Sequence, residues 1–236
     1  MKAYYYWEGS EEPKYLLSCK QSWMNHGLDV EKISLNYRDF LSIDFVYKYA
    51  KKKNWAYISD YLRYVWFKEH EGIYFDCDMF LCRDIPEEFY NSDISVACES
   101  CRHISNGIMK FSKNSKLIQD LCKIYENYSN ETENKTLKSP KIFMKACNIE
   151  KFNIYKNEIK IINGIKIFGR EYCYPLGYYG RKPTFSEKTF AIHQWHASAE
   201  KSKLMQDSIN NVYKKYNKEL KDFLKETNSE YFDRSL

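Results

Sequence analysis

The stretch that decides the fold is NWAYISDYLRYVWFKEHEGIYFDCDMFL, residues 54–81. From Asp60 to about Glu69 its apolar residues recur three to four positions apart, which predicts a helix with one buried face. We expect Ser59 to cap the start of this helix and Gly72 to end it in a left-handed turn. The apolar run Ile73–Phe75 then predicts a short buried strand.

Two carboxylates follow that strand. Side chains two positions apart in an extended chain point the same way, so we expect Asp76 and Asp78 to face one direction. Neighbouring carboxylates repel each other unless a positive charge lies between them, and a divalent cation with oxygen ligands supplies one. Asp60 and Arg63, three positions apart, share one face of the preceding helix. The pattern predicts that three acids and an arginine meet at one point, although an isolated D-x-D also fits a solvated turn.

The order of these motifs resembles a known family. Residues 59–64 (SDYLRY) and 71–78 (EGIYFDCD) are similar to the core of the DXD sugar-binding glycosyltransferases. That family includes small bacterial enzymes of capsule, O-antigen and lipooligosaccharide assembly, yeast initiating α-mannosyltransferases and, remotely, clostridial glucosylating toxins. The resemblance extends to about Ala199, and it departs from the usual Gly-Gly at Glu71-Gly72. It implies an α/β fold of the GT-A nucleotide-sugar transferase type, with a central, mostly parallel sheet flanked by helices.

The segments along the chain also indicate an α/β fold. Ala3–Trp7 and Leu28–Leu35 are expected strands, each followed by an expected helix, Lys14–His26 and Ser42–Lys51. Ligands of such sheets bind beyond the carboxyl ends of the strands, where the D-x-D falls. Further on we expect a strand at Asp93–Cys98, helices at Ser115–Tyr128 and Ser139–Cys147, a surface loop at 129–138 and a hairpin at Ile159–Phe168.

Three more residues acquire roles through the resemblance. Trp7, in a Tyr-Trp-Glu-Gly pattern, would stack on the base of a nucleotide; the alternative is a core tryptophan. Asn106 would contact the donor sugar, although Asn-Gly is also an ordinary turn signal. Tyr74 would line the same pocket unless it points into the core.

The resemblance extends to a histidine segment, FAIHQWHAS at 190–198. Family members often carry His-His-aromatic-x-x-Ser-Trp, where this segment helps to hold the metal and the diphosphate. His193 matches the first histidine and Gln194 replaces the second. We therefore expect Asp76, Asp78 and His193 to bind the metal, with Gln194 or His196 as alternatives to His193. Asp78 is the expected direct ligand, and Asp76 reaches the metal through water or contacts the donor sugar. A histidine after an apolar strand is otherwise an ordinary core residue.

The resemblance implies a metal-dependent, retaining glycosyltransferase. Mn²⁺, or else Mg²⁺, would neutralise the donor diphosphate, and Asp60 and Arg63 would position the donor sugar. The sequence indicates no catalytic base. A UDP-hexose is the favoured donor ahead of GDP-mannose, the acceptor is a glycan, including a lipid-linked one, and the setting is bacterial surface polysaccharide synthesis. The alternatives are a metal-dependent nucleotide-sugar hydrolase, a non-catalytic binding module and an effector that glycosylates a host protein.

The composition sets limits on location and partners. A net charge of +5 is too small to indicate a nucleic-acid-binding protein. The first residues lack the apolar core of a signal peptide and no run is long enough to span a membrane, so we expect a cytoplasmic protein. The eight cysteines are scattered, which favours reduced thiols over a disulfide framework. A single C-x-x-C at Cys98 and Cys101 lacks the second pair of a zinc site.

The chain divides in our prediction into a catalytic domain at 1–200 and a basic amphipathic helix within 201–236. From Ile209 to Leu224 apolar residues follow a helical spacing, and lysines occupy the other face. Such a helix either packs on the same domain or lies on the inner face of an anionic membrane.

Overall fold

The computed structural model describes residues 1–128, 139–177, 181–196 and 203–229. Within these ranges the chain forms a central seven-stranded sheet, of order β2-β1-β3-β6-β5-β8-β7, and a second sheet in which β4 pairs with β9. The strands are β1 (Lys2–Tyr5), β2 (Asp29–Lys32), β3 (Gly72–Phe75), β4 (Met79–Leu81), β5 (Ile94–Ser100), β6 (His103–Phe111), β7 (Ile159–Ile162), β8 (Ile165–Phe168) and β9 (Ala191–His193).

The central sheet is mixed, with most strands pointing the same way. β1 pairs in parallel with β2 and β3, and β5 pairs in parallel with β8. β6 is antiparallel to both of its neighbours, and β7 is antiparallel to β8. Only β6 and β7 therefore run against the other strands described in this sheet. The predicted α/β fold, a mostly parallel central sheet flanked by helices, is confirmed.

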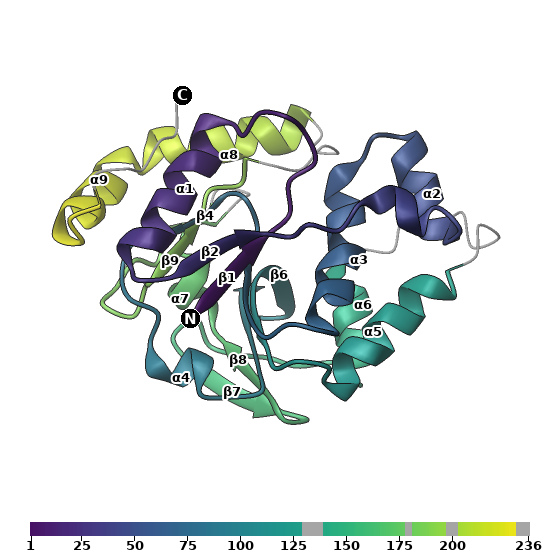
Figure 1. Cartoon of the computed structure of the whole chain (residues 1–236). Helices are drawn as coiled ribbons and strands as arrows, with labels where there is room; N and C mark the ends of the chain where they lie inside the picture. The colour runs from purple at the N-terminus through teal and green to yellow at the C-terminus, as the bar shows by residue number, and fades with distance from the viewer. Residues whose placement is uncertain (129–138, 178–180, 197–202, 230–236) are drawn as a thin grey trace.

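Helices cover both faces of the central sheet (Figure 1). They are α1 (Lys14–Asn25), α2 (Asp44–Lys51), α3 (Trp55–Phe67), α4 (Glu87–Tyr90), α5 (Lys116–Glu126), α6 (Ser139–Ala146), α7 (Arg170–Cys173), α8 (Lys203–Lys215) and α9 (Asn217–Glu226), with a 3-10 turn at Tyr37–Phe40. One core cluster joins the sheet to α2, α3, α5 and α6. The other joins it to α1, α8, α9 and the small sheet.

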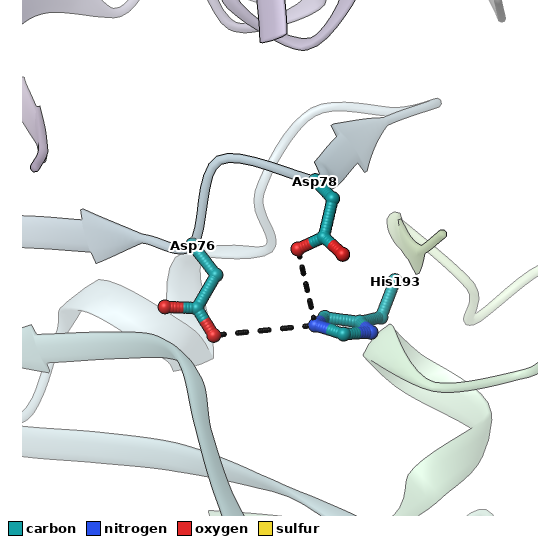
Figure 2. A group of neighbouring side chains, drawn as sticks. All are labelled: Asp76, Asp78 and His193. Atoms are coloured by element: carbon teal, nitrogen blue, oxygen red, sulfur yellow. Dashed lines mark ion pairs between the residues drawn. The ribbon is translucent and has the colours of Figure 1, made fainter. Parts of the chain in front are cut away.

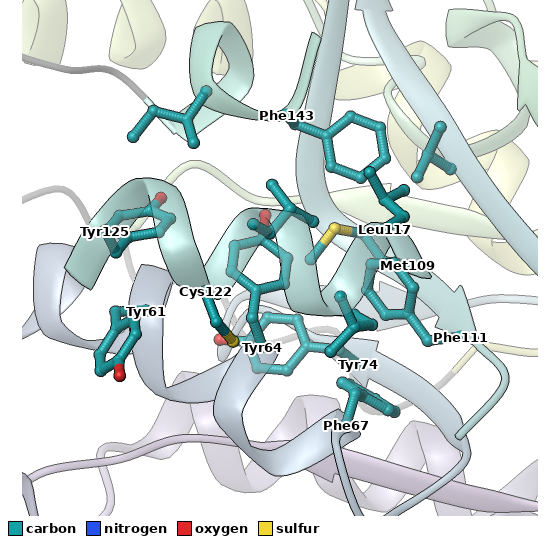
Figure 3. Close-up of a cluster of buried hydrophobic side chains, with 14 of the residues drawn as sticks. Tyr61, Tyr64, Phe67, Tyr74, Met109, Phe111, Leu117, Cys122, Tyr125 and Phe143 are labelled. Carbon is teal, nitrogen blue, oxygen red and sulfur yellow. The ribbon is translucent and has the colours of Figure 1, made fainter. Parts of the chain in front are cut away.

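The pleat of the strands separates the two clusters. Tyr4 and Tyr74 belong to the first cluster, whereas Tyr5 and Phe75, next to them in the chain, belong to the second. Figure 3 shows part of the first cluster, where Tyr64, Tyr74 and Met109 pack together among other aromatic side chains. Each large apolar side chain buried in this way contributes roughly 1.5–3 kcal/mol relative to exposure. The core therefore holds β3, and the acidic segment after it, firmly between two layers of helices.

The central helix α3 differs from its prediction at both ends. It begins at Trp55, and Ser59 lies inside it, donating from Oγ to the Ala56 carbonyl at 2.7 Å. The predicted Ser59 cap was wrong, because Asn54 takes the N-cap position. The helix ends at Phe67 instead of Gly72.

Gly72 has a different reason to be glycine. It opens β3 with φ +144°, and a Cβ there would lie 2.6 Å from the Lys2 carbonyl oxygen. The residue therefore permits close approach to the neighbouring strand, in a backbone conformation that other residues rarely adopt.

Other expectations are met with small shifts. The hairpin of β7 and β8 turns at Asn163 and Gly164, both with positive φ, as an Asn-Gly turn requires. The helix expected from Ile209 to Leu224 is two helices, α8 and α9, because the chain leaves helical geometry at Tyr216. Asn106 and Gly107 lie inside β6 and form no turn. The expected loop at 129–138 lies outside the described residues. Among the described helices, none combines the length and the apolar character needed to cross a membrane.

Candidate active site

The D-x-D forms a tight turn that links the two sheets. The Asp76 backbone N–H donates to the Gly107 carbonyl at 2.7 Å, and the Met79 N–H donates back to the Asp76 carbonyl at 3.0 Å. The chain thus leaves β3 and enters β4 within a few residues. We expected the two carboxylates to face one direction through an extended strand; this turn, and not a pleat, is what brings them together.

Pairing of the small sheet carries a histidine to these acids. β4 and β9 are antiparallel, with Met79 opposite His193. The Nε2 atom of His193 lies 3.3 Å from Asp78 Oδ1 and 4.0 Å from Asp76 Oδ2 (Figure 2). One ligand atom from each of the three residues lies within 4.8 Å of the others. Among the described residues, this is the one group of three His, Cys, Asp or Glu side chains with metal-ligand spacing.

The two alternatives to His193 have other contacts. The Gln194 side chain donates to Cys19 Sγ at 3.4 Å in the core. The His196 ring stacks on Tyr15, with centroids 4.6 Å apart, while its backbone N–H donates to Asp78 Oδ2 at 2.7 Å. His193, in contrast, has a ring nitrogen that approaches the carboxylates of both Asp76 and Asp78.

A glycine keeps the space between these ligands open. A Cβ on Gly107 would lie 2.7 Å from the Tyr174 hydroxyl, 3.1 Å from Asp76 Oδ2 and 3.1 Å from His193 Cδ2. The Tyr174 hydroxyl also accepts a hydrogen bond from the Gly107 N–H at 3.1 Å. Two carboxylates and an imidazole around such a space form a donor set that can hold a divalent cation. Sequence reasoning missed Gly107, because its Asn-Gly pair reads as a turn.

Arg63 joins the D-x-D segment to Asp60. Its Nη1 lies 3.3 Å from Asp76 Oδ1 and its Nη2 lies 2.8 Å from Asp60 Oδ1. The guanidinium also donates to the Asn106 carbonyl at 2.7 Å and to the Ser59 carbonyl at 2.9 Å. The group is 2% exposed, and its carbon lies 4.1 Å from the centre of the Tyr74 ring. The predicted convergence of Asp60, Arg63 and the D-x-D is present.

Burial and the charge of Arg63 shift the pKa values of Asp76 and Asp60 in opposite directions. Burial raises the pKa of Asp76, Arg63 opposes this, and the charge of Asp78 raises it further. Burial likewise raises the pKa of Asp60 against the effect of Arg63. The carboxylates are therefore costly to keep charged together, and a bound cation would relieve that cost.

A cleft opens beside these residues. Its cavity volume is about 180 Å³, smaller than a closed pocket for a drug-sized ligand, and it is open to solvent. Its polar lining includes Asp60, Arg63, Asp76 and Asp78. Its aromatic lining includes Tyr6, Trp7, Trp55 and Tyr74.

The two tryptophans occupy different positions on that lining. Trp7 is partly buried, and its Nε1 donates to the Glu11 carbonyl at 2.9 Å. It therefore borders the cleft and is not a fully buried core residue. Trp55, the first residue of α3, was missed from the sequence; its one signal is an aromatic side chain just before the S-D-x-x-R segment.

Asn106 is turned away from the cleft. Its Nδ2 donates to the Tyr64 hydroxyl at 3.0 Å and to Ser139 Oγ, and only its backbone carbonyl contacts Arg63. It is not among the described residues that line the cleft. Its position is that of a support for Arg63.

Comparisons with known proteins address this region directly. Residues 3–97 match the family model described as "Glycosyltransferase sugar-binding region containing DXD motif". A human protein, alpha-1,4-N-acetylglucosaminyltransferase, is 24% identical over 188 residues, which cover 71% of this chain and 52% of that protein. The chain thus spans about half the length of this curated relative. Among solved structures, the PaToxG glycosyltransferase aligns with a TM-score of 0.48 at 17% identity, over 63% of this chain and 68% of that one.

Proposed function

We propose that this protein, whose residues 3–97 match the model of glycosyltransferase sugar-binding regions containing a DXD motif, transfers a sugar from a nucleotide donor to a hydroxyl of a glycan acceptor. The predicted relationship to that family is thereby confirmed. The observation that carries the proposal is the convergence of Asp76, Asp78 and His193 at the edge of the cleft. The acid pair Asp60 and Asp76, joined by Arg63, extends the site along the cleft.

The donor diphosphate is assigned to the metal side of the cleft. Asp76, Asp78 and His193 would hold a divalent cation, Mn²⁺ ahead of Mg²⁺ because one ligand is an imidazole. Such a cation neutralises charge that develops on a departing diphosphate. Gly107 leaves room for it, since any side chain there would fill the space between the ligands.

The sugar and the base are assigned to the rest of the cleft. Asp60 accepts hydrogen bonds from sugar hydroxyls, and its carboxylate is held in place by Arg63 at 2.8 Å. Trp7 stacks on the base, since an indole face exposed to a cleft suits a flat ring. Tyr74, whose ring centre lies 4.1 Å from the guanidinium carbon, supports Arg63 and borders the same cleft.

The finer assignments follow the resemblance. The donor is a UDP-hexose ahead of GDP-mannose, transfer retains the anomeric configuration, and the acceptor belongs to a bacterial surface polysaccharide. We assign no general base to a residue of this chain. The 1–200 catalytic domain, and contact of the lysine-rich face of α8 and α9 with an anionic membrane, remain proposals of the same kind.

A thermal-shift panel tests the proposal. UDP, GDP, CMP and their sugars are added to the wild type and to Asp78→Asn, each with and without Mn²⁺. A ligand at a hundred times its dissociation constant stabilises the fold by about 2.7 kcal/mol, which is a clear rise in Tm. One nucleotide family should stabilise the wild type only with the metal, and Asp78→Asn should lose that effect. Absence of any nucleotide effect would refute the transferase assignment, and donor consumption that releases free sugar without an acceptor would favour a hydrolase.

A further inference from the structure

A second hollow, larger than the cleft, is lined by the turn after β5 and by α6. Its cavity volume is about 620 Å³, within the range of ligand-binding sites, and it is open to solvent. Arg102 and His103, where the chain turns from β5 into β6, supply part of the lining. Lys141, Met144 and Lys145 of α6 supply another part. We call this hollow the basic groove.

The helical spacing of α6 explains why these three side chains share the groove. Lys141, Met144 and Lys145 fall at positions i, i+3 and i+4, which lie on one face of a helix. Ile142 and Phe143, on the other side, are buried in the core. Met144 is itself partly buried against that core, so it gives the groove an apolar surface between two lysines.

The charge of the groove is mostly positive. Arg102, Lys141 and Lys145 are exposed, and Glu150 is the one acid among the described lining residues. Within the described part of the chain, no ion pair neutralises any of the three cations. Cations gathered around one hollow attract anions, and a guanidinium can bind a carboxylate or a phosphate through two hydrogen bonds.

The groove lies at the same edge of the central sheet as the D-x-D. β6 runs antiparallel to both β5 and β3, so it begins at the edge where those two strands end. Phe75 pairs with Ile108, and residues 103–106 therefore continue past the end of β3. Four residues of strand separate His103 from Gly107, which borders Asp76 and the metal-ligand group; this corresponds to about 13 Å.

The α6 side of the groove is also fixed to the candidate active site. Ser139, the first residue of α6, accepts a hydrogen bond at Oγ from Asn106 Nδ2. The carbonyl of Asn106 in turn accepts from Arg63 Nη1 at 2.7 Å. The lysines of α6 are therefore held at a defined position relative to Arg63.

We propose that the basic groove binds an anionic saccharide, as part of the acceptor of the transfer reaction. This inference rests on the function proposed above. Arg102, Lys141 and Lys145 bind carboxylate or phosphate groups of the saccharide, and Met144 contacts the apolar faces of its sugar rings. A separation of about 13 Å exceeds one sugar ring. The charged group therefore lies on a different sugar from the one whose hydroxyl is glycosylated.

Nuclear magnetic resonance of the isotope-labelled wild type, without nucleotide, tests the groove directly. The probes are hyaluronan tetrasaccharide, which carries carboxylates, a phosphorylated maltotetraose, the neutral chitotetraose and inorganic phosphate. An acidic saccharide should shift the amide signals of Arg102, His103 and Lys145. It should bind at least about tenfold more tightly than chitotetraose, and high ionic strength should reduce that difference. Comparison of the two acidic probes identifies the preferred anion.

A double variant tests the lysines. Lys141→Ala combined with Lys145→Ala removes two charges from exposed helix positions, where alanine favours the helix. It should raise the Kd of the acidic saccharide at least about tenfold and leave the metal-dependent nucleotide effect unchanged. If it does not fold, Lys141→Gln with Lys145→Gln, which keeps the side-chain length, takes its place.

The matched control removes two other lysines at the same spacing. Lys221→Ala with Lys225→Ala makes the same change of charge at exposed positions of α9. Neither lysine lines the basic groove, so the affinity for the acidic saccharide should stay within about twofold of the wild type. In transfer assays with the identified donor, the α6 double variant should raise the KM of an acidic acceptor and not that of the donor.

The outcomes separate this inference from the proposed function. Equal binding of acidic and neutral tetrasaccharides, inorganic phosphate bound as tightly as the saccharides, or an α6 double variant with wild-type affinity would overturn the inference and leave the transferase assignment intact. Acidic saccharides bound in the groove of a protein that shows no nucleotide effect would overturn the proposed function, and with it the acceptor role.

Discussion

The Nη1 atom of Arg63 lies 3.3 Å from Oδ1 of Asp76, while the other oxygen of that carboxylate faces His193. One carboxylate is therefore shared between a buried arginine and the candidate metal-binding group of Asp76, Asp78 and His193. The arginine is in turn held by the Ser59 and Asn106 carbonyls. One guanidinium thus fixes the geometry of both the D-x-D segment and Asp60.

Arg63→Lys should be strongly destabilising. An ammonium cannot reproduce the forked set of bonds to Asp60, Asp76 and two carbonyls, so buried polar groups lose their partners. We expect a loss of about 2–4 kcal/mol in the free energy of unfolding, measured by urea denaturation. Lys68→Ala, which removes an ion pair with Glu126 whose side chains are 36% and 37% exposed, should cost less than about 1 kcal/mol. Equal losses in the two variants would contradict the role of Arg63 as the joint of the site.

Gly107→Ala should abolish metal-dependent stabilisation while leaving a folded protein. The added methyl group would lie 3.1 Å from Asp76 Oδ2 and 3.1 Å from His193 Cδ2, inside the space between the ligands. The measurement is the change in Tm on addition of Mn²⁺ with nucleotide. Gly164→Ala is the matched control: it has open space around it but φ +78°, so it should cost about 1–2 kcal/mol of stability and keep the metal response. A Gly107→Ala variant with wild-type metal response would show that the cation binds elsewhere.

His193→Ala should lower Mn²⁺ affinity far more than His196→Ala. The first removes the ring nitrogen 3.3 Å from Asp78 Oδ1, whereas the second removes a ring stacked on Tyr15 and leaves the backbone N–H on Asp78 intact. We expect the Mn²⁺ affinity to fall at least about tenfold in His193→Ala and by less in His196→Ala. The measurement is a Mn²⁺ titration followed by electron paramagnetic resonance. The reverse order would make His196 the third ligand.

Trp7→Ala should weaken nucleotide binding without affecting the metal ligands. Stacking of a base on an aromatic side chain contributes roughly 1–3 kcal/mol, which corresponds to a rise in the Kd of the diphosphate of about 5- to 150-fold. Trp7→Phe, which keeps an aromatic face, should recover part of the affinity. If Trp55→Ala gives the larger loss, the base lies against α3, because both tryptophans border the cleft.

Much of this arrangement follows from local sequence patterns. The helix before the D-x-D, the buried strand Ile73–Phe75 and the short strand before His193 were all expected, because each has a clear apolar pattern or turn signal. The ends of α3 were not expected. Serine often starts a helix, but the residues before Ser59 are themselves helical, so Ser59 lies inside α3.

The contacts that complete the site could not be predicted in the same way. Gly107 matters because of the ligands on three other segments that surround its missing Cβ. Ser139 and Asn106 meet through the packing of α6 on β6, at a sequence separation of 33 residues. The periodicity of a single segment does not predict such a contact, because the contact depends on which distant element packs against that segment.

The D-x-D turn belongs to both sheets at once, since β3 precedes it in the large sheet and β4 follows it in the small one. A cation bound there would link segments far apart in the chain, because it would hold β9, the strand of His193, against β4. When the metal is withdrawn, β9 would then open before the rest of the fold. Hydrogen exchange in β9, with and without Mn²⁺, would report that release before any change reached the central sheet.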